Sequence, residues 1–194
     1  MRLRLLHFFV FVAVFSLPPQ LLGCFRPGPC TYIGTRYDRA EIRKVAVFPF
    51  YNNTEVSEAS RIVTGAFIAN LVEQGKFKVE FPGSVRRFLV SERIIVRTGI
   101  DLDTINLMGK RLGVDAVVLG RVEEYVGSSE EKKDVIPLVS ISSRLVDIRT
   151  GEILFMAQHR RTGEDYRLFL DFGEIRSAGA LAKRVVAEII DEMP

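Results

Sequence analysis

The feature that most constrains this chain is a short apolar run followed by an amphipathic segment and a second apolar run. Residues 45–50 (VAVFPF) are rich in β-branched and aromatic residues, which is typical of a strand buried on both faces. Between residues 62 and 71, apolar side chains recur at spacings of three and four, which predicts a helix that packs on a sheet and ends at Gly75. Residues 77–81 predict a second strand. This order fits a parallel β-α-β crossover and therefore an α/β fold.

The rest of the chain predicts two further helices, three long strands and a last helix. The helices are expected over 84–95, from a cap at Asp101 or Asp103 to Gly113, and over 173–192; the strands are expected over 115–126, 135–148 and 152–160. Residues 149–151 form a tight turn in which Gly151 takes a positive φ and Asp147 bonds the turn amides. The predicted order is βαβααβββα: an α/β fold with a mixed sheet, helices packed on it, and long antiparallel strands in the C-terminal half.

Residues 1–23 have the pattern of a signal peptide. Two arginines precede an apolar run over 5–17, which is shorter than the roughly 20 residues that a membrane-spanning helix needs. Residues 21–24 (LLGC) resemble the lipobox of bacterial lipoproteins, in which a peptidase cuts between Gly23 and Cys24 and lipid is attached to Cys24. The alternatives are an uncleaved anchor and an ordinary secretory signal, but the A-x-A-like site of an ordinary signal is absent.

The chain has two cysteines. If Cys24 carries fatty acids such as palmitate, Cys30 has no partner within the chain, whereas a disulfide between them would require a chain without lipid. We therefore divide the sequence into a signal peptide (1–23), a lipidated cysteine with a flexible tether (24–43) and a single periplasmic α/β domain (44–194).

Charge and composition argue against nucleic acid binding and against catalysis. The leader holds two arginines and no acidic residue, so 25 of the 27 basic residues remain against 24 acidic ones, and no polyanionic partner is indicated. His159 is the single histidine beyond the leader, and no cysteine or histidine pair has metal-ligand spacing. Serines 140, 142 and 143 lack a nucleophile-elbow context. We expect no catalytic residue, metal or cofactor, and we interpret His159 as a solvated or hydrogen-bonded strand residue.

Three further segments carry a family resemblance: KVAVFPFYNNT (44–54), RLGVDAVVLGRVEEY (111–125) and LVDIRTGEI (145–153). In this order behind a lipobox, they resemble the outer-membrane lipoproteins typified by the curli-secretion channel subunit (CsgG-like). The core fold of that family is shared with the polysaccharide-export lipoprotein PelC and with lipoprotein activators of peptidoglycan synthases. The resemblance implies a periplasmic domain on an outer-membrane lipid anchor, often assembled into rings. Phe25, in place of an aspartate after the cysteine, favours the outer membrane.

Two surfaces are candidates for partner contacts. Arg86, Arg87, Arg93 and Arg97 lie around the second predicted helix and could meet lipid phosphates or an acidic neighbour, or could form a solvated helix face partly paired with Glu92. Residues 166–172 (YRLFLDF) could bury their apolar side chains in the core, or could present Phe169, Leu170 and Phe172 as a subunit contact.

These observations favour a lipid-anchored, non-enzymatic component of an envelope secretion or assembly system that self-associates as a homo-oligomer. The first alternative is a monomeric lipoprotein activator of a periplasmic cell-wall enzyme. The second alternative is an export-channel subunit. It is disfavoured because the channel-forming relatives insert two amphipathic hairpins per subunit into the membrane, and the loop over 127–134 is too short and too charged for that.

Overall fold

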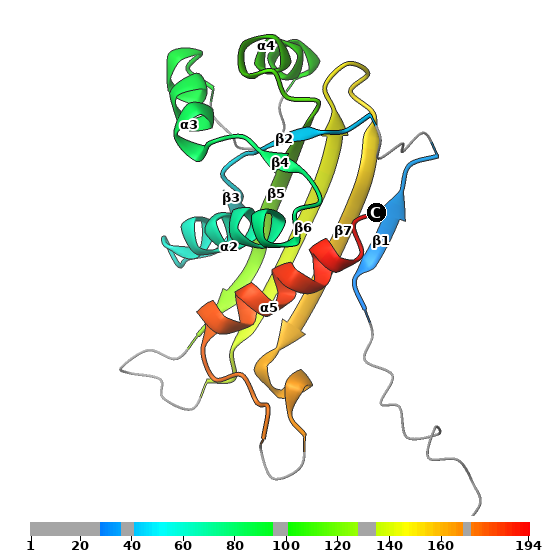
Figure 1. Ribbon diagram of the computed structural model, residues 1–194. Coiled ribbons are helices and arrows are strands. Elements are labelled where there is room, and N and C mark those ends of the chain that lie inside the picture. The colour runs from blue at the N-terminus through cyan, green and yellow to red at the C-terminus, as the bar shows by residue number, and fades with distance from the viewer. Residues whose placement is uncertain (1–27, 36–40, 95–100, 128–134, 169–171) are drawn as a thin grey trace, which may run out of the picture.

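The computed structural model describes residues 28–35, 41–94, 101–127, 135–168 and 172–194. Within them, seven strands form one mixed sheet and four α-helices pack on it (Figure 1). The strands are β1 (Cys30–Ile33), β2 (Lys44–Val47), β3 (Tyr51–Asn52), β4 (Lys78–Val79), β5 (Ala116–Val126), β6 (Leu138–Asp147) and β7 (Ile153–Thr162). The helices are α2 (Ala59–Gln74), α3 (Pro82–Ser91), α4 (Leu102–Leu112) and α5 (Ala178–Asp191), and a short 3-10 helix, η2 (Gly163–Tyr166), follows β7.

The strand order in the sheet is β1-β7-β6-β5-β2-β4, and β3 pairs with β5. Strand β2 runs parallel to β4 and to β5, which confirms the predicted β-α-β arrangement through α2. Strands β5, β6, β7 and β1 are successive antiparallel neighbours, which confirms the long antiparallel strands of the C-terminal half. The predicted order βαβααβββα is therefore correct, and the structure adds β1, β3 and η2 to it.

Alternate residues of the central strands enter two different buried clusters. Val45 and Val47 of β2 pack with α2 and α5, whereas Ala46 and Phe48 pack with α3 and α4 on the other side of the sheet. Strand β5 is buried on both faces over its first four residues and alternates afterwards, as predicted. We call the side under α2 and α5 the covered face, and the other side the half-open face, because α3 and α4 shield only one part of it.

The two ends of the sheet differ in what lies on them. Figure 1 shows α3 and α4 at one end, beside the hairpin that joins β6 to β7. Helix η2 and the start of α5 lie at the opposite end, where β5 and β7 finish. We call these the α3/α4 end and the η2 end. No helix in the described residues is long and apolar enough to cross a membrane.

Helix boundaries follow local signals that the sequence contains. The Asp101 carboxylate accepts a hydrogen bond from the Thr104 amide at 2.8 Å, which makes Asp101 the cap of α4. Gly75 and Gly113 end α2 and α4 with positive φ angles of 63° and 59°. The predicted starts of two other helices were wrong: α3 begins at Pro82, a residue favoured in the first turn, and α5 begins after Ser177, which caps it.

Part of the segment predicted as a flexible tether is a strand. Residues 30–33 form β1, which pairs antiparallel with β7, and the Gly34 amide donates to the Leu154 carbonyl at 2.8 Å. All four residues of β1 are exposed, because β1 is an edge strand with solvent on both faces. An edge strand of this kind needs no alternation of apolar and polar residues, so the sequence offered no period to detect.

Candidate functional site

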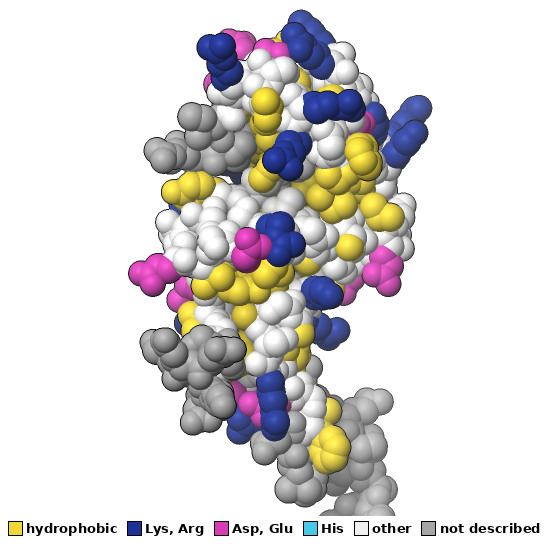
Figure 2. Space-filling view, turned by 90° about the vertical axis from the view of Figure 1, so that its left-hand side faces the viewer, with side chains coloured by type: hydrophobic (Ala, Val, Ile, Leu, Met, Phe, Trp, Pro, Cys, Tyr) yellow, Lys and Arg dark blue, Asp and Glu magenta, His cyan; other side chains and the backbone are white. Residues whose placement is uncertain are grey.

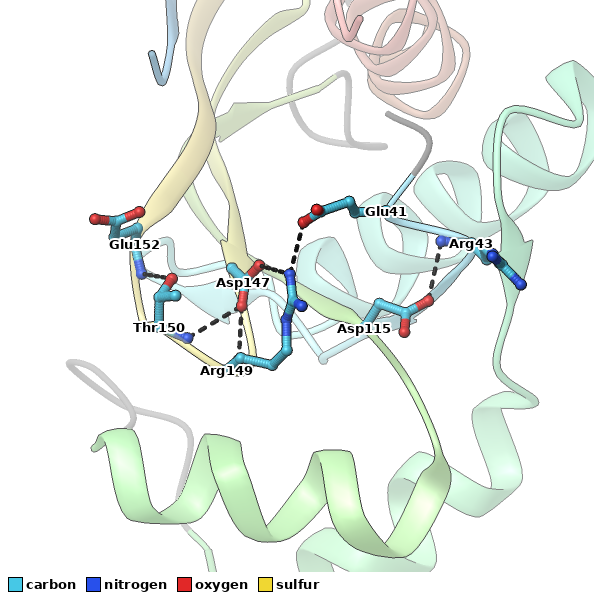
Figure 3. Close-up of polar contacts among 7 residues, drawn as sticks. All are labelled: Glu41, Arg43, Asp115, Asp147, Arg149, Thr150 and Glu152. Atoms are coloured by element: carbon cyan, nitrogen blue, oxygen red, sulfur yellow. Dashed lines mark hydrogen bonds and ion pairs between the residues drawn. The ribbon is translucent and has the colours of Figure 1, made fainter. Parts of the chain in front are cut away.

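The three segments that carry the family resemblance meet in space. The Asp115 carboxylate, immediately before β5, accepts a hydrogen bond from the Arg43 amide at 2.9 Å (Figure 3) and another from the Lys44 amide at 2.9 Å. The Lys44 ammonium in turn donates to the Leu112 carbonyl at 2.8 Å and pairs with Glu80. Burial raises the pKa of the Glu80 carboxyl, but the hydrogen bond from Lys44 is the larger effect and lowers it. These contacts hold β2 beside β5. The residues that carry this part of the family resemblance therefore reflect a shared fold.

The hairpin between β6 and β7 is fixed in the same way. Asp147 accepts hydrogen bonds from the amides of Arg149 and Thr150 at 2.6 and 3.1 Å, and Gly151 has φ 72°, which confirms both predictions for this turn. The Arg149 guanidinium pairs with Glu41 at 2.8 Å and reaches Asp147 at 3.5 Å (Figure 3). The hydrogen bond to Glu41 is the main reason that the pKa of Arg149 is raised. The turn is thereby tied to the residues that precede β2.

A buried polar network lies on the covered face near the η2 end. Glu188 of α5 meets His159 at 2.7 Å, accepts a hydrogen bond from the Tyr166 hydroxyl at 3.0 Å, and pairs with Arg161 at 3.4 Å and with Arg184 at 3.1 Å. His159, Arg161 and Tyr166 are each at most 5% exposed. The prediction of a hydrogen-bonded His159 is confirmed. The network joins β7 and η2 to α5.

The contacts of this network explain the shifted pKa values of Glu188 and Tyr166. Burial is the largest single effect and would raise the pKa of the Glu188 carboxyl, but the hydrogen bonds from His159 and Tyr166, together with the charge of Arg161, outweigh it and lower the pKa. Burial, and then the charge of Glu188, raise the pKa of the Tyr166 hydroxyl. Sequence reasoning missed Glu188, Arg161 and Arg184. The available signals were polar residues at core-facing positions 159 and 161 of a strand, and the i,i+4 spacing of Arg184 and Glu188.

The predicted basic surface lies at the α3/α4 end. Arg86 and Arg87 are exposed on α3, and none of the described residues forms an ion pair with either of them. Phe81 and Val90 are 70% and 71% exposed at the two ends of the same helix. Figure 2 shows lysine and arginine side chains gathered over this end of the molecule. We call Phe81, Arg86, Arg87 and Val90 the α3 surface.

Two other predictions about the basic cluster have different outcomes. Glu92 pairs with Arg111 of α4 at 2.7 Å, and thus joins two helices rather than neutralising the α3 arginines. Arg93 lies beyond the end of α3 with φ 55°, and Arg97 lies outside the described residues.

The predicted apolar contact lies at the opposite, η2 end. Phe172 is 71% exposed and Leu168 is 66% exposed, while Tyr166 is buried. Phe169 and Leu170 lie outside the described residues, as do Gly23 and Cys24. Cys30 is a free, exposed cysteine in β1. The candidate contact residues therefore form two separate surfaces, one at each end of the sheet, and the structure does not bring them together.

A third surface was not predicted. Tyr32 and Ile33 of β1 are about half exposed at the edge of the sheet. An open cleft of about 560 Å³ adjoins them and is lined by Tyr32, Gly34, Thr35, Glu152, Ile153 and Leu154. Within the described part of the chain, no group of three or more histidine, cysteine, aspartate or glutamate side chains could hold a metal ion.

Comparisons with known proteins place the chain in a family. The family model of the peptidoglycan-synthase activator LpoB matches residues 31–160, from β1 through most of β7, and the chain belongs to this family. No curated protein matches the chain.

Solved structures of other proteins have a similar fold, including the following two. The PelC dodecamer from Paraburkholderia phytofirmans has a TM-score of 0.58 at 19% identity, covering 84% of this chain and 93% of that chain. The lipoprotein GNA1162 from Neisseria meningitidis has a TM-score of 0.51 at 19% identity, covering 78% of this chain and 97% of that chain. The matches thus support the activator and PelC parts of the expected resemblance, and the CsgG-like part stays a prediction.

Proposed function

We propose that this protein is a lipid-anchored accessory protein of the cell envelope that binds a peptidoglycan synthase and raises its activity. The observation that carries the proposal is the match of the synthase-activator family to residues 31–160, which contain the sheet almost completely. The lipobox-like residues 21–24 support an anchor on Cys24, with the domain facing the periplasm from the outer membrane. Accessory proteins of this kind act by contact, which agrees with the expectation of a non-enzymatic function.

The α3 surface is the part of the molecule best suited to contact a synthase. Exposed arginines beside exposed apolar side chains are the composition found at the centre of protein interfaces, where charged residues of other kinds are depleted. Arg86 and Arg87 have no ion pair among the described residues, so their charges remain available to an acidic partner. Val90 lies three and four positions further along α3, on the same side of the helix, and adds exposed apolar area next to these positions.

The test measures the glycan polymerisation and peptide cross-linking rates of a peptidoglycan synthase from the same bacterium, with and without the lipidated protein. We expect the wild-type protein to raise these rates, and the double variant Arg86→Glu/Arg87→Glu to lose most of the effect. Lys78→Glu/Lys183→Glu is the matched control, because it makes the same change of charge at exposed positions on β4 and α5. Equal losses in both variants, or no stimulation by the wild type of any synthase of that bacterium, would contradict the proposal.

Self-association in a secretion or assembly system is the second candidate. It is favoured by the exposed edge strand β1, which can accept another strand, and by the assembly of the similarly folded PelC into a dodecamer. Phe169, Leu170 and Phe172 are the predicted contacts for such an assembly. The mass of the detergent-extracted protein separates the two candidates: a large symmetric particle supports self-association, and a monomer that co-purifies with a synthase supports activation.

A further inference from the structure

Strand β1 shortens the chain between the anchor and the domain. If all of residues 24–43 were a tether, it would span at most roughly 65 Å, at 3.3–3.6 Å per residue. Because β1 is bound to β7 from Cys30 on, only six peptide units separate Cys24 from the folded domain, a reach of about 20 Å. A lipid on Cys24 therefore keeps the domain close to the bilayer.

The pairing of β1 also gives the tether a direction. Cys30 lies opposite Gln158, and Figure 1 shows the described residues before β1 continuing toward the η2 end, where β7 finishes at Thr162. That end is four residues beyond Gln158, or about 13 Å away, and the four peptide units between Cys24 and Gly28 span at most about 14 Å. Toward the α3/α4 end, β7 begins five residues before Gln158, about 17 Å from Cys30, and the described residues before β1 lead away from that end. The η2 end is thus the end nearest to the anchor.

The chemistry of the η2 end suits a lipid surface. Four of its large apolar side chains are exposed: Val126 at 42%, Ile136 at 46%, Leu168 at 66% and Phe172 at 71%. Val126 ends β5, which pairs there with the start of β6, next to Ile136. Leu168 and Phe172 follow η2, whose Gly163 amide donates to the Pro137 carbonyl at 2.8 Å. The Leu168 amide donates to the Phe172 carbonyl at 2.7 Å, which holds these two apolar residues beside each other.

Several charges in the described residues 164–176 at this end are paired within the protein. The Arg167 guanidinium pairs with Glu164 at 2.7 Å and with Glu174 at 3.7 Å, and Arg176 pairs with Glu174 at 3.7 Å. Carboxylates that are already paired with arginines repel the negative lipid headgroups less than free carboxylates would. Exposed apolar side chains that are anchored this near to a bilayer gain a high effective concentration at its surface.

We propose that the η2 end rests on the membrane, with Leu168 and Phe172 in the headgroup region, and that the α3 surface is directed away from it. The inference rests on the lipidation of Cys24 given under the proposed function. It adds an orientation to that function. By pairing with β7, β1 holds one end of the sheet near the lipid and leaves the other end facing partners in the periplasm.

The chain contains no tryptophan, so a single introduced tryptophan reports its own position. The lipidated full-length variants Phe172→Trp and Phe81→Trp are placed in vesicles of phosphatidylethanolamine and phosphatidylglycerol, with and without bromine on the acyl chains. We expect Trp fluorescence to lose most of its intensity in brominated vesicles for Phe172→Trp and to be unchanged for Phe81→Trp, which is equally exposed at the other end. Quenching of Phe81→Trp, or equal emission of Phe172→Trp in both vesicles, overturns the orientation. A blue-shifted but unquenched Phe172→Trp would assign this end to a second copy of the chain instead.

Flotation of the protein with the vesicles separates the possible failures. A protein that does not float and has no added lipid mass overturns the anchor, and with it both the proposed function and the orientation. A protein that floats but leaves Phe172→Trp unquenched overturns the orientation alone.

Insertion of a Gly/Ser segment of roughly 20 residues between Cys24 and Cys30 should keep flotation and weaken the quenching, since the longer linker lowers the effective concentration. Unchanged quenching in this variant would contradict the inference that the short tether holds the η2 end at the membrane.

Discussion

The two faces of the sheet differ in how much of their area helices cover. On the covered face, α2 and α5 bury the strands along their length, and the buried Glu188 network joins β7 and η2 to α5. On the half-open face, α3 and α4 shield the part near β2, and the rest carries exposed or partly exposed side chains such as Arg121, Arg144 and Met156. The difference indicates that the covered face supplies most of the stability, while the half-open side and the ends of the sheet remain available for contacts.

The largest expected effect comes from two adjacent residues of β7 that point to opposite faces. Phe155 is fully buried on the covered face, and Met156 is 43% exposed on the other. We expect Phe155→Ala to lower the free energy of unfolding by about 3–5 kcal/mol, because it leaves a cavity in a packed core. Met156→Ala should cost less than about 1 kcal/mol. Equilibrium unfolding in urea measures both, and equal losses would contradict the contrast between the faces.

The next effect compares two glutamates. Replacing Glu188 by alanine leaves His159, Arg161 and Tyr166 buried without their shared acceptor, and should cost about 2–4 kcal/mol. Glu123 lies on the half-open face, where it accepts from the Ser142 hydroxyl at 3.0 Å and pairs with Arg121 at 3.8 Å. Because its pairing is partly solvated, Glu123→Ala should cost less than about 1 kcal/mol. A smaller loss for Glu188→Ala than for Glu123→Ala in urea unfolding would show that the network is dispensable.

A third contrast uses two glycines. A methyl group at Gly120 would lie 2.1 Å from the Phe50 ring, which is itself held against Phe67 with ring centroids 5.1 Å apart. Gly120→Ala should therefore destabilise the protein by about 1–3 kcal/mol through overpacking. Gly65 on α2 has open space around it, so Gly65→Ala should stabilise the protein by about 0.5–1 kcal/mol. Thermal unfolding reports the opposite signs, and a stabilising Gly120→Ala would mean that the Phe50 ring can move aside.

The sequence predicted the elements that depend on local patterns. The buried run of β2, the cap at Asp101 and the turn at Asp147 were found because each depends on neighbours a few residues away. Strand β1 was missed because its pairing partner lies more than 120 positions further along the chain and both its faces are exposed. For the same reason, the sequence placed His159 on a strand but did not identify Glu188 as its partner.

The candidate surfaces were predicted in part. Arg86 and Arg87 were recognised because charges on a helix show in the sequence, and the structure adds the exposed Val90 on the same helix and the exposed Phe81 at its start. The sequence did not indicate that this surface and Phe172 lie at opposite ends, because that depends on how the strands are ordered in the sheet. The orientation inferred for the membrane follows from the order of the strands and from the pairing of β1, neither of which is a local property.

The smallest effect is the dependence of stability on pH through Glu188. The pKa of Glu188 in the folded protein is lower than its ordinary value of 4.5. The unfolded chain therefore takes up a proton before the folded protein does as the pH falls. The stabilisation is fully present above pH 4.5 and is lost as the pH falls through the lower pKa of the folded state. A protonated Glu188 still fills its site and keeps some hydrogen bonds, so the loss of stability should be smaller than that of Glu188→Ala.

Urea unfolding of the wild type and of Glu188→Gln between neutral and acidic pH measures this loss, with Glu123→Gln as the control on the half-open face. The variant Glu188→Gln should lose less stability on acidification than the wild type, and parallel curves for the two would place the acid sensitivity elsewhere.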